Sequence, residues 1–114
     1  MYDEQEDLNQ IELDIDHARE AIDRADALKR LFANKDFKRI IENGYFVDEA
    51  SRLVLVKADP EMDSPEAQVN IQRSIDAIGP LRVYFRAILQ FGDMAQRAIV
   101  DDEQTRENIL TEVQ

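Results

Sequence analysis

The chain has 114 residues, and its 25 Asp and Glu against 14 Lys and Arg give a net charge of −11. It contains no Cys and a single His, which excludes a disulfide scaffold, a Cys-ligated zinc or iron–sulfur site, a thiol nucleophile and a multi-His metal site within one chain. The length predicts a single domain, residues 1–114.

The first predicted element is a helix over about residues 4–33. No Gly or Pro occurs between residues 1 and 43, which favours helix. Apolar residues recur with alternating spacings of three and four, as in the a and d positions of a coiled coil, and only Lys29 breaks the pattern. The positions are Leu8, Ile11, Ile15, Ala18, Ile22, Ala25 and Phe32.

Two short helices are predicted next, at about 36–43 and 49–58. Asn43-Gly44 predicts a stop with a left-handed glycine, and Tyr45-Phe46-Val47 then reads as a connector with large apolar groups. The run 53–56 could instead form a short buried strand. Helix is the better prediction, because no second strand-like run exists to pair with it.

The remaining elements are a loop at 59–64, a kinked helix at about 65–100 and a C-terminal turn at about 105–113. Ser64-Pro65 is a typical helix start, with a cap followed by proline at the first position. Gly79-Pro80 predicts a kink or break, since Pro80 removes a backbone hydrogen bond. The acidic run 101–103 interrupts the apolar pattern before Thr105 caps the last turn.

The sequence therefore predicts an all-α fold, a long antiparallel helical hairpin or small bundle with a short helical insert and coiled-coil-like seams. One hairpin of this size has a thin core, so we expect self-association through the apolar seams. The candidate interface residues are Leu8, Ile11, Ile15, Ile22, Phe85 and Ile88. The aromatic residues best suited to anchor an interface are Tyr45, Phe46, Tyr84, Phe85 and Phe91, with core packing as the default for each.

The acidic residues gather at the two ends of the sequence and in the 59–64 loop, whereas the middle is nearly neutral. A nucleic-acid-binding protein would instead show a basic stripe, so direct nucleic-acid binding is not expected, although a local patch at Lys35, Lys38 and Arg39 stays open. No apolar run is long enough to span a bilayer, and the first residues are acidic where a secretory signal would be basic and then apolar. We expect no membrane association and a cytosolic location.

Two groups of residues have side chains of the kinds that bind metals. His17 lies three residues from Asp14 and from Glu20, so the three share adjacent helical turns, but the second Glu-x-x-His of a di-metal bundle is missing. The loop acids Asp59, Glu61 and Asp63 alternate as calcium ligands do, but the central Gly and the distal Glu are not in place. Neither group predicts a metal site.

The sequence also contains none of the common catalytic motifs. The three Gly residues are isolated, no Gly-Lys-Ser/Thr occurs, and no Ser lies in a nucleophile elbow. Arg82 and Arg86, one turn apart, could grip a carboxylate or phosphate, but pairing with the acidic termini, within one chain or between chains, is the more common arrangement on charged helices. The sequence predicts a protein that is not an enzyme and takes no cofactor.

Several stretches resemble small acidic helical proteins of tailed bacteriophages. They are Leu28–Phe32 through Asn34, Asp36–Lys38, Gly44-Tyr45, Glu49-Ala50, Arg52–Val54 and Ile75–Gly79, and the pattern spans roughly residues 8–112. The resemblance implies a genomic context and transfers no functional residue. It implies a role in virion assembly or host modulation, in the cytoplasm of the host cell or in the virion.

Three classes of function follow. The first is a phage protein acting through protein–protein interaction in virion structure or assembly, associated with scaffold, capsid or portal, and binding itself or another phage or host protein. The second is an acidic inhibitor of a host nucleic-acid-binding or defence protein that imitates DNA. The third, an enzyme, needs a site that the sequence does not display.

Overall fold

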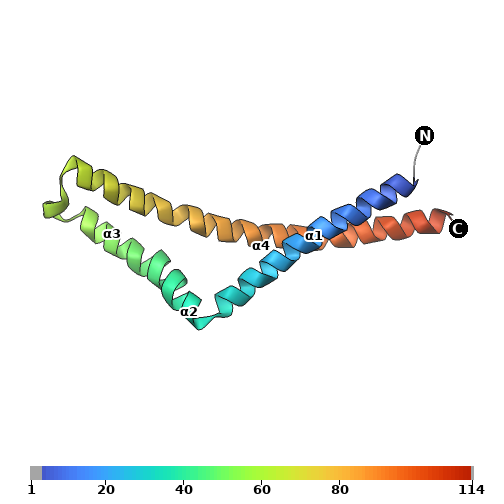
Figure 1. The fold of residues 1–114 in the computed structure, drawn as a ribbon, viewed down its shortest axis with the longest axis horizontal. Helices are drawn as coiled ribbons and strands as arrows, with labels where there is room; N and C mark the ends of the chain where they lie inside the picture. Colours follow the sequence, from blue (N-terminus) through green and yellow to red (C-terminus); the bar gives the residue numbers. More distant parts are fainter. Residues whose placement is uncertain (1–3, 114) are drawn as a thin grey trace. The chain divides into compact units, whose positions relative to one another are not determined.

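A computed structural model describes residues 4–113 of the protein (Figure 1). Every described residue is helical except Asn34 and the stretches 58–59 and 63–64 of one loop. The elements are α1 (Glu4–Ala33), α2 (Lys35–Phe37), η1 (Lys38–Glu49), α3 (Ala50–Lys57), η2 (Pro60–Met62) and α4 (Pro65–Val113). The all-α prediction is confirmed.

Helix α1 ends and helix α4 begins at the predicted residues, Ala33 and Pro65. At the start of α4 the hydroxyl Oγ of Ser64 accepts a hydrogen bond from the amide of Ala67 at 3.1 Å, directly before Pro65 in the first turn. The helix also contains Pro80, which is exposed, so the ring lies on the solvent side.

The predicted break of α4 at residues 101–103 is wrong. The helix continues to Val113, and the half-buried Asp102 and Arg106 extend the alternating spacing of three and four from Ile99 to Ile109. Two charged residues, Asp102 and Arg106, therefore occupy positions of the helix seam. The sequence prediction expected only apolar residues at seam positions, and for that reason it ended the helix there.

The predicted stop at Gly44 is also wrong, since α2, η1 and α3 follow one another without a gap and Gly44 does not adopt a positive φ. The η1 segment is a π-helix, which has more residues per turn than an α-helix. The apolar Ile41 and Phe46, both half-buried, are five residues apart. Five residues complete about one π turn but overshoot an α turn, so the wider helix keeps both on one face.

The loop between α3 and α4 lies where the sequence predicted a loop, and it contains the single turn η2, which was not predicted. Asp59 caps it, since its Oδ1 accepts a hydrogen bond from the Glu61 amide at 2.9 Å. The amide nitrogen Nε2 of Gln68 on α4 donates to the carbonyl oxygens of Met62 at 2.7 Å and of Lys57 at 3.1 Å. These bonds fix the loop against the start of α4.

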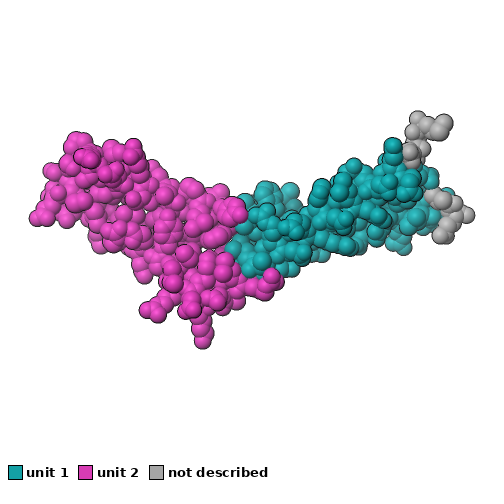
Figure 2. Space-filling model, viewed as in Figure 1, with its two compact units in different colours: residues 1–28, 87–114 teal, residues 29–86 magenta. Residues whose placement is uncertain are grey.

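The chain forms two compact units (Figure 2), and the predicted single domain stays a prediction. Unit 1 comprises residues 1–28 and 87–114, so it pairs α1 with the last part of α4. Ion pairs Arg19–Glu103 (3.8 Å) and Arg106–Glu12 (3.9 Å) show that this pairing is antiparallel. Its buried residues are Ile15, Ala25, Leu28, Ala95, Ile99 and Ile109.

Unit 2 comprises residues 29–86. It pairs η1 and α3 with the first part of α4, also antiparallel, and buries Leu53 and Ile71. Lys57 Nζ donates to Gln72 Oε1 at 2.7 Å near the loop, and the rings of Phe46 and Phe85 meet further along, with centroids 6.1 Å apart.

Candidate interaction surfaces

The predicted interface residues contribute to packing within the chain. Ile15 is buried with 2% of its surface exposed, and the others are half-buried, namely Leu8, Ile11, Ile22, Phe85 and Ile88. Five of the six belong to unit 1, where the antiparallel helices bury their own seam. Their use between copies of the chain stays a prediction.

The two candidate metal sites do not assemble. His17, Asp14 and Glu20 are all exposed on α1, and Gln10 donates to Asp14 Oδ1 at 3.0 Å. Within residues 4–113 no group of three or more His, Asp or Glu could hold a metal ion. Asp59 of the loop is engaged as the cap of η2.

A cluster of four phenylalanine rings joins the segments of unit 2. Phe85 on α4 is central, with ring centroids 5.7 Å from Phe32, 5.9 Å from Phe37 and 6.1 Å from Phe46. The arrangements are edge-on, as aromatic rings prefer. All four side chains are half-buried, so the cluster serves as a core rather than an exposed aromatic platform.

Seven cations flank this cluster, and we call them the basic cluster: Lys29, Arg30, Lys35, Lys38, Arg39, Arg82 and Arg86. The ring contacts of Phe85 with Phe32 and Phe37 bring the segment 29–39 and residues 82–86 together within unit 2. All seven are exposed, and none forms an ion pair with a described residue. Within residues 4–113 of one chain, Arg82 and Arg86 do not pair with the acidic termini, and the alternative of pairing between chains stays a prediction.

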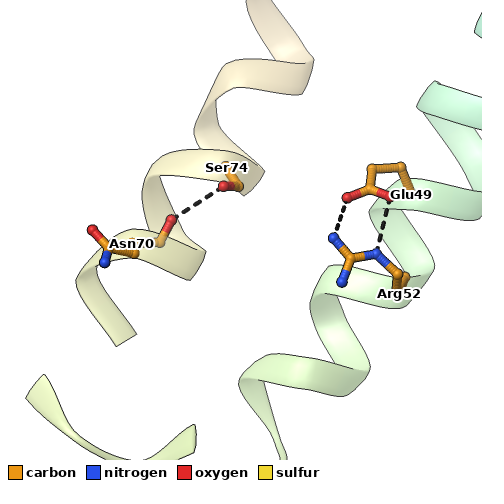
Figure 3. A network of polar contacts seen from close by, with 4 residues as sticks. All are labelled: Glu49, Arg52, Asn70 and Ser74. Atoms are coloured by element: carbon orange, nitrogen blue, oxygen red, sulfur yellow. Dashed lines mark hydrogen bonds and ion pairs between the residues drawn. The ribbon is translucent and has the colours of Figure 1, made fainter. Parts of the chain in front are cut away.

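Four arginines outside the basic cluster, Arg19, Arg52, Arg97 and Arg106, have carboxylate partners. Figure 3 shows this for Arg52 and Glu49, one turn apart on η1 and α3. The Arg52 Nε donates to Glu49 Oε2 at 3.0 Å, and Nη2 donates to Oε1. The hydrogen bond from Arg52 holds the pKa of Glu49 below its ordinary value, and Glu49 raises the pKa of Arg52. In the same view Ser74 Oγ donates to the Asn70 carbonyl oxygen at 3.2 Å.

Unit 1 carries all the net negative charge of the chain. Its described residues, 4–28 and 87–113, hold fifteen Asp and Glu against four Arg, a net charge of −11, and we call them the acidic helical pair. Unit 2 holds ten Lys and Arg against nine Asp and Glu, a net charge of +1. The sequence placed the acids at both ends, and the antiparallel pairing brings those ends together.

Large apolar side chains are more often exposed than buried. Thirteen are exposed, whereas the six buried ones are Ile15, Leu28, Leu53, Ile71, Ile99 and Ile109. On α4 of unit 1, Phe91 and Met94 are each 60% exposed, one position before the buried Gly92 and Ala95. No polar or charged side chain among the described residues is buried.

Comparison with protein-family models, with curated proteins and with solved structures gave no match. Across residues 4–113 no helix is both long enough and apolar enough to cross a membrane.

Two separate basic groups stand out in the sequence, Lys35 with Lys38 and Arg39, and Arg82 with Arg86, but nothing in the sequence joins them. The missing information was the contact of Phe85 with Phe32 and Phe37, which links residues about 50 positions apart. What these surfaces offer is charge complementarity and exposed apolar area, which suit binding of a macromolecule.

Proposed function

We propose that the protein acts without catalysis, through protein–protein contacts, and that its role is virion structure or assembly in a tailed bacteriophage. The observation that supports this most is that more large apolar side chains are exposed than buried, thirteen against six. A chain that leaves so much apolar surface in water is best suited to work bound to other polypeptides. The phage context rests on the sequence resemblance alone.

The test is site-specific photo-cross-linking in the cells that produce the protein. A photoreactive residue at Phe91 or Val54, which are 60% and 59% exposed, should cross-link to another polypeptide. The same residue at the exposed polar positions Gln90 and Ser51 on the same helices is the control. Identification of the cross-linked chain as a particle protein supports the assembly role. Equal yields at all four positions would contradict it.

A second candidate is an acidic inhibitor that imitates DNA, and one observation favours it. The acidic helical pair gathers fifteen carboxylates along helices of about 25 residues, or roughly 37 Å. Duplex DNA carries roughly 22 charges over that length, so the density is lower but comparable. If this candidate is correct, plain duplex DNA should displace the protein from its partner at physiological salt. If the assembly role is correct, duplex DNA should have no effect.

A further inference from the structure

The basic cluster lacks partners although the chain has an excess of acids. Its seven cations are exposed and form no ion pair with described residues, whereas the cations of Arg19, Arg52, Arg97 and Arg106 each contact a carboxylate. The segment 29–39 contains one acid, Asp36, against five bases, and 82–86 contains none against two. The two segments thus carry a net charge of about +6 on a chain whose net charge is −11.

The acidic helical pair has the opposite property. Of its fifteen carboxylates, those of Glu12, Asp93 and Glu103 contact an arginine, and most others face solvent. Asp16 and Glu20, one turn apart on α1, are exposed and lie outside the seam. The chain therefore displays a positive surface on one unit and a negative surface on the other.

We propose that the basic cluster of one copy binds the acidic helical pair of a second copy, so that copies associate head to tail. This inference rests on the proposed function, since it names one partner of a protein that acts through protein contacts. The contact joins different surfaces of the two copies, so it is heterologous, and it produces rings or open chains rather than closed dimers.

The observations favour a second copy over a nucleic acid. A polyanion approaching the protein is repelled by a net charge of −11, which the charge of about +6 on the two segments does not offset. Single-stranded nucleic acids also bind by stacking successive bases on exposed aromatic rings. The four phenylalanine rings beside the basic cluster are half-buried against one another, and Tyr84, 52% exposed, offers a single ring. A second copy supplies a dense negative surface with helical spacing.

The test is sedimentation velocity over a range of protein and salt concentrations, with two charge-reversed variants. One carries Lys35→Glu and Arg39→Glu in the basic cluster, and the other carries Asp16→Lys and Glu20→Lys in the acidic helical pair. The matched control, Lys57→Glu with Arg73→Glu, changes one Lys and one Arg of unit 2 outside the cluster and alters the net charge equally. Circular dichroism verifies that each variant folds.

We expect the wild-type chain to associate at low salt and to dissociate as salt rises, with association weakened about tenfold or more in either reversed variant. The control should stay within about twofold of the wild type. Mixing the two variants should restore one contact between unlike copies, because the second variant keeps the unchanged basic cluster and the first keeps the unchanged acidic helical pair.

A monomer at all low-salt concentrations, an equal loss in the control, or failure of the mixed variants to associate would overturn the inference. A different partner would also overturn it: the wild-type chain would bind an oligonucleotide without associating with itself, and the Lys35→Glu and Arg39→Glu substitutions would abolish that binding. A monomeric chain that still cross-links to another polypeptide through Phe91 or Val54 would leave the proposed function standing, so the two failures are distinguishable.

Discussion

Gly92 of α4 and Ala25 of α1 face each other so closely that no side chain fits at position 92. A β carbon there would lie 2.3 Å from the Ala25 Cβ and 3.4 Å from the Ala21 carbonyl oxygen. Carbon atoms that are not bonded pack at about 3.5–4.0 Å. Both β carbons would be attached directly to the backbone, so rotation of a side chain cannot relieve the overlap. The pair sets the separation of the two helices in unit 1.

We therefore expect Gly92→Ala to destabilise the protein. The helices must separate to admit the methyl group, which costs about 1–3 kcal/mol in a packed core, and the higher helix propensity of Ala returns about 1 kcal/mol. The net loss of unfolding free energy, up to about 2 kcal/mol, is measurable by chemical denaturation followed by circular dichroism.

Moving the methyl group across the contact tests whether the pair itself is responsible. Ala25→Gly removes the atom that a side chain at position 92 would meet, at a cost in helix propensity of about 1 kcal/mol. The double variant, with Ala at 92 and Gly at 25, should be more stable than the sum of the two single changes predicts, by about 1–2 kcal/mol. If the changes in unfolding free energy of the two single variants simply added up in the double variant, the contact between positions 25 and 92 would not be the cause of the destabilisation.

Phe85 should be the most sensitive aromatic residue on α4. Its ring contacts those of Phe32, Phe37 and Phe46, so Phe85→Ala opens the centre of the cluster. We expect a loss of about 3 kcal/mol in unfolding free energy, toward the lower end for a phenylalanine because the side chain is half-buried. Phe91→Ala is the matched control on the same helix, and at 60% exposure it should cost less than about 1 kcal/mol.

At Gly44 the π-helix η1 has no room for a side chain unless the backbone shifts. A β carbon there would lie 2.8 Å from the carbonyl oxygen of Arg39, five residues earlier on the same π-helix. Gly44→Ala should lower the unfolding free energy by about 1 kcal/mol despite the better helix propensity of Ala. The neighbouring Asn43 is exposed, so Asn43→Ala should change it by no more than about 0.5 kcal/mol. Equal effects would show that the carbonyl contact is not the cause.

The ion pair of Glu49 and Arg52 predicts a specific pH dependence. The hydrogen bond from Arg52 lowers the pKa of Glu49 below its ordinary value of 4.5, so the folded chain favours the ionised carboxylate. Its stabilising contribution is complete above the ordinary value and is lost as pH falls through the lowered one. The thermal midpoints of the wild type and Glu49→Gln should differ at neutral pH and converge in acid. If the difference in thermal midpoint between the wild type and Glu49→Gln were the same at every pH, the charge of Glu49 would not be its cause.

The helical periodicity of the sequence was sufficient to predict α1 and the start of α4. The spacing from Leu8 to Ala25 repeats with few exceptions, and Ser64-Pro65 is a strong start signal. Lys29 broke the predicted pattern, and the structure places it in solvent while burying Leu28 instead. A shift of one residue in the seam is small on the helix surface, so the element itself was predicted correctly.

The errors arose where local signals compete with packing. Asn43-Gly44 has the composition of a helix stop, but Gly44 lies within η1, where packing of Ile41 and Phe46 on one face favours a wider turn. The acidic run before Thr105 resembles an interruption, but Asp102 continues the seam. The two halves of the basic cluster are visible in the sequence, but their association could not be predicted, since it depends on ring contacts between residues far apart in sequence.

The concentration of charge in unit 1 leads to a last prediction, on the response of each unit to salt. The acidic helical pair bears −11 within one unit, so mutual repulsion among its carboxylates opposes folding of that unit. Raising the salt concentration from about 0.01 M to about 0.15 M shortens the screening length from roughly 30 Å to 8 Å and weakens that repulsion. Unit 2, at +1, has little net repulsion to screen.

Amide hydrogen exchange followed by mass spectrometry resolves the two units, because peptides can be assigned to residues 4–28 and 87–113 or to residues 29–86. Exchange in unit 1 should slow with added salt, while exchange in unit 2 should change little. Protein concentrations low enough to keep the chain monomeric separate this effect from association. The variant Asp16→Lys with Glu20→Lys lowers the negative charge of unit 1 by four, so its exchange should be slower than that of the wild type at low salt and less sensitive to added salt. If salt protected both units equally, screening within the acidic helical pair would not be the cause, and a general effect of salt on folding would account for the result.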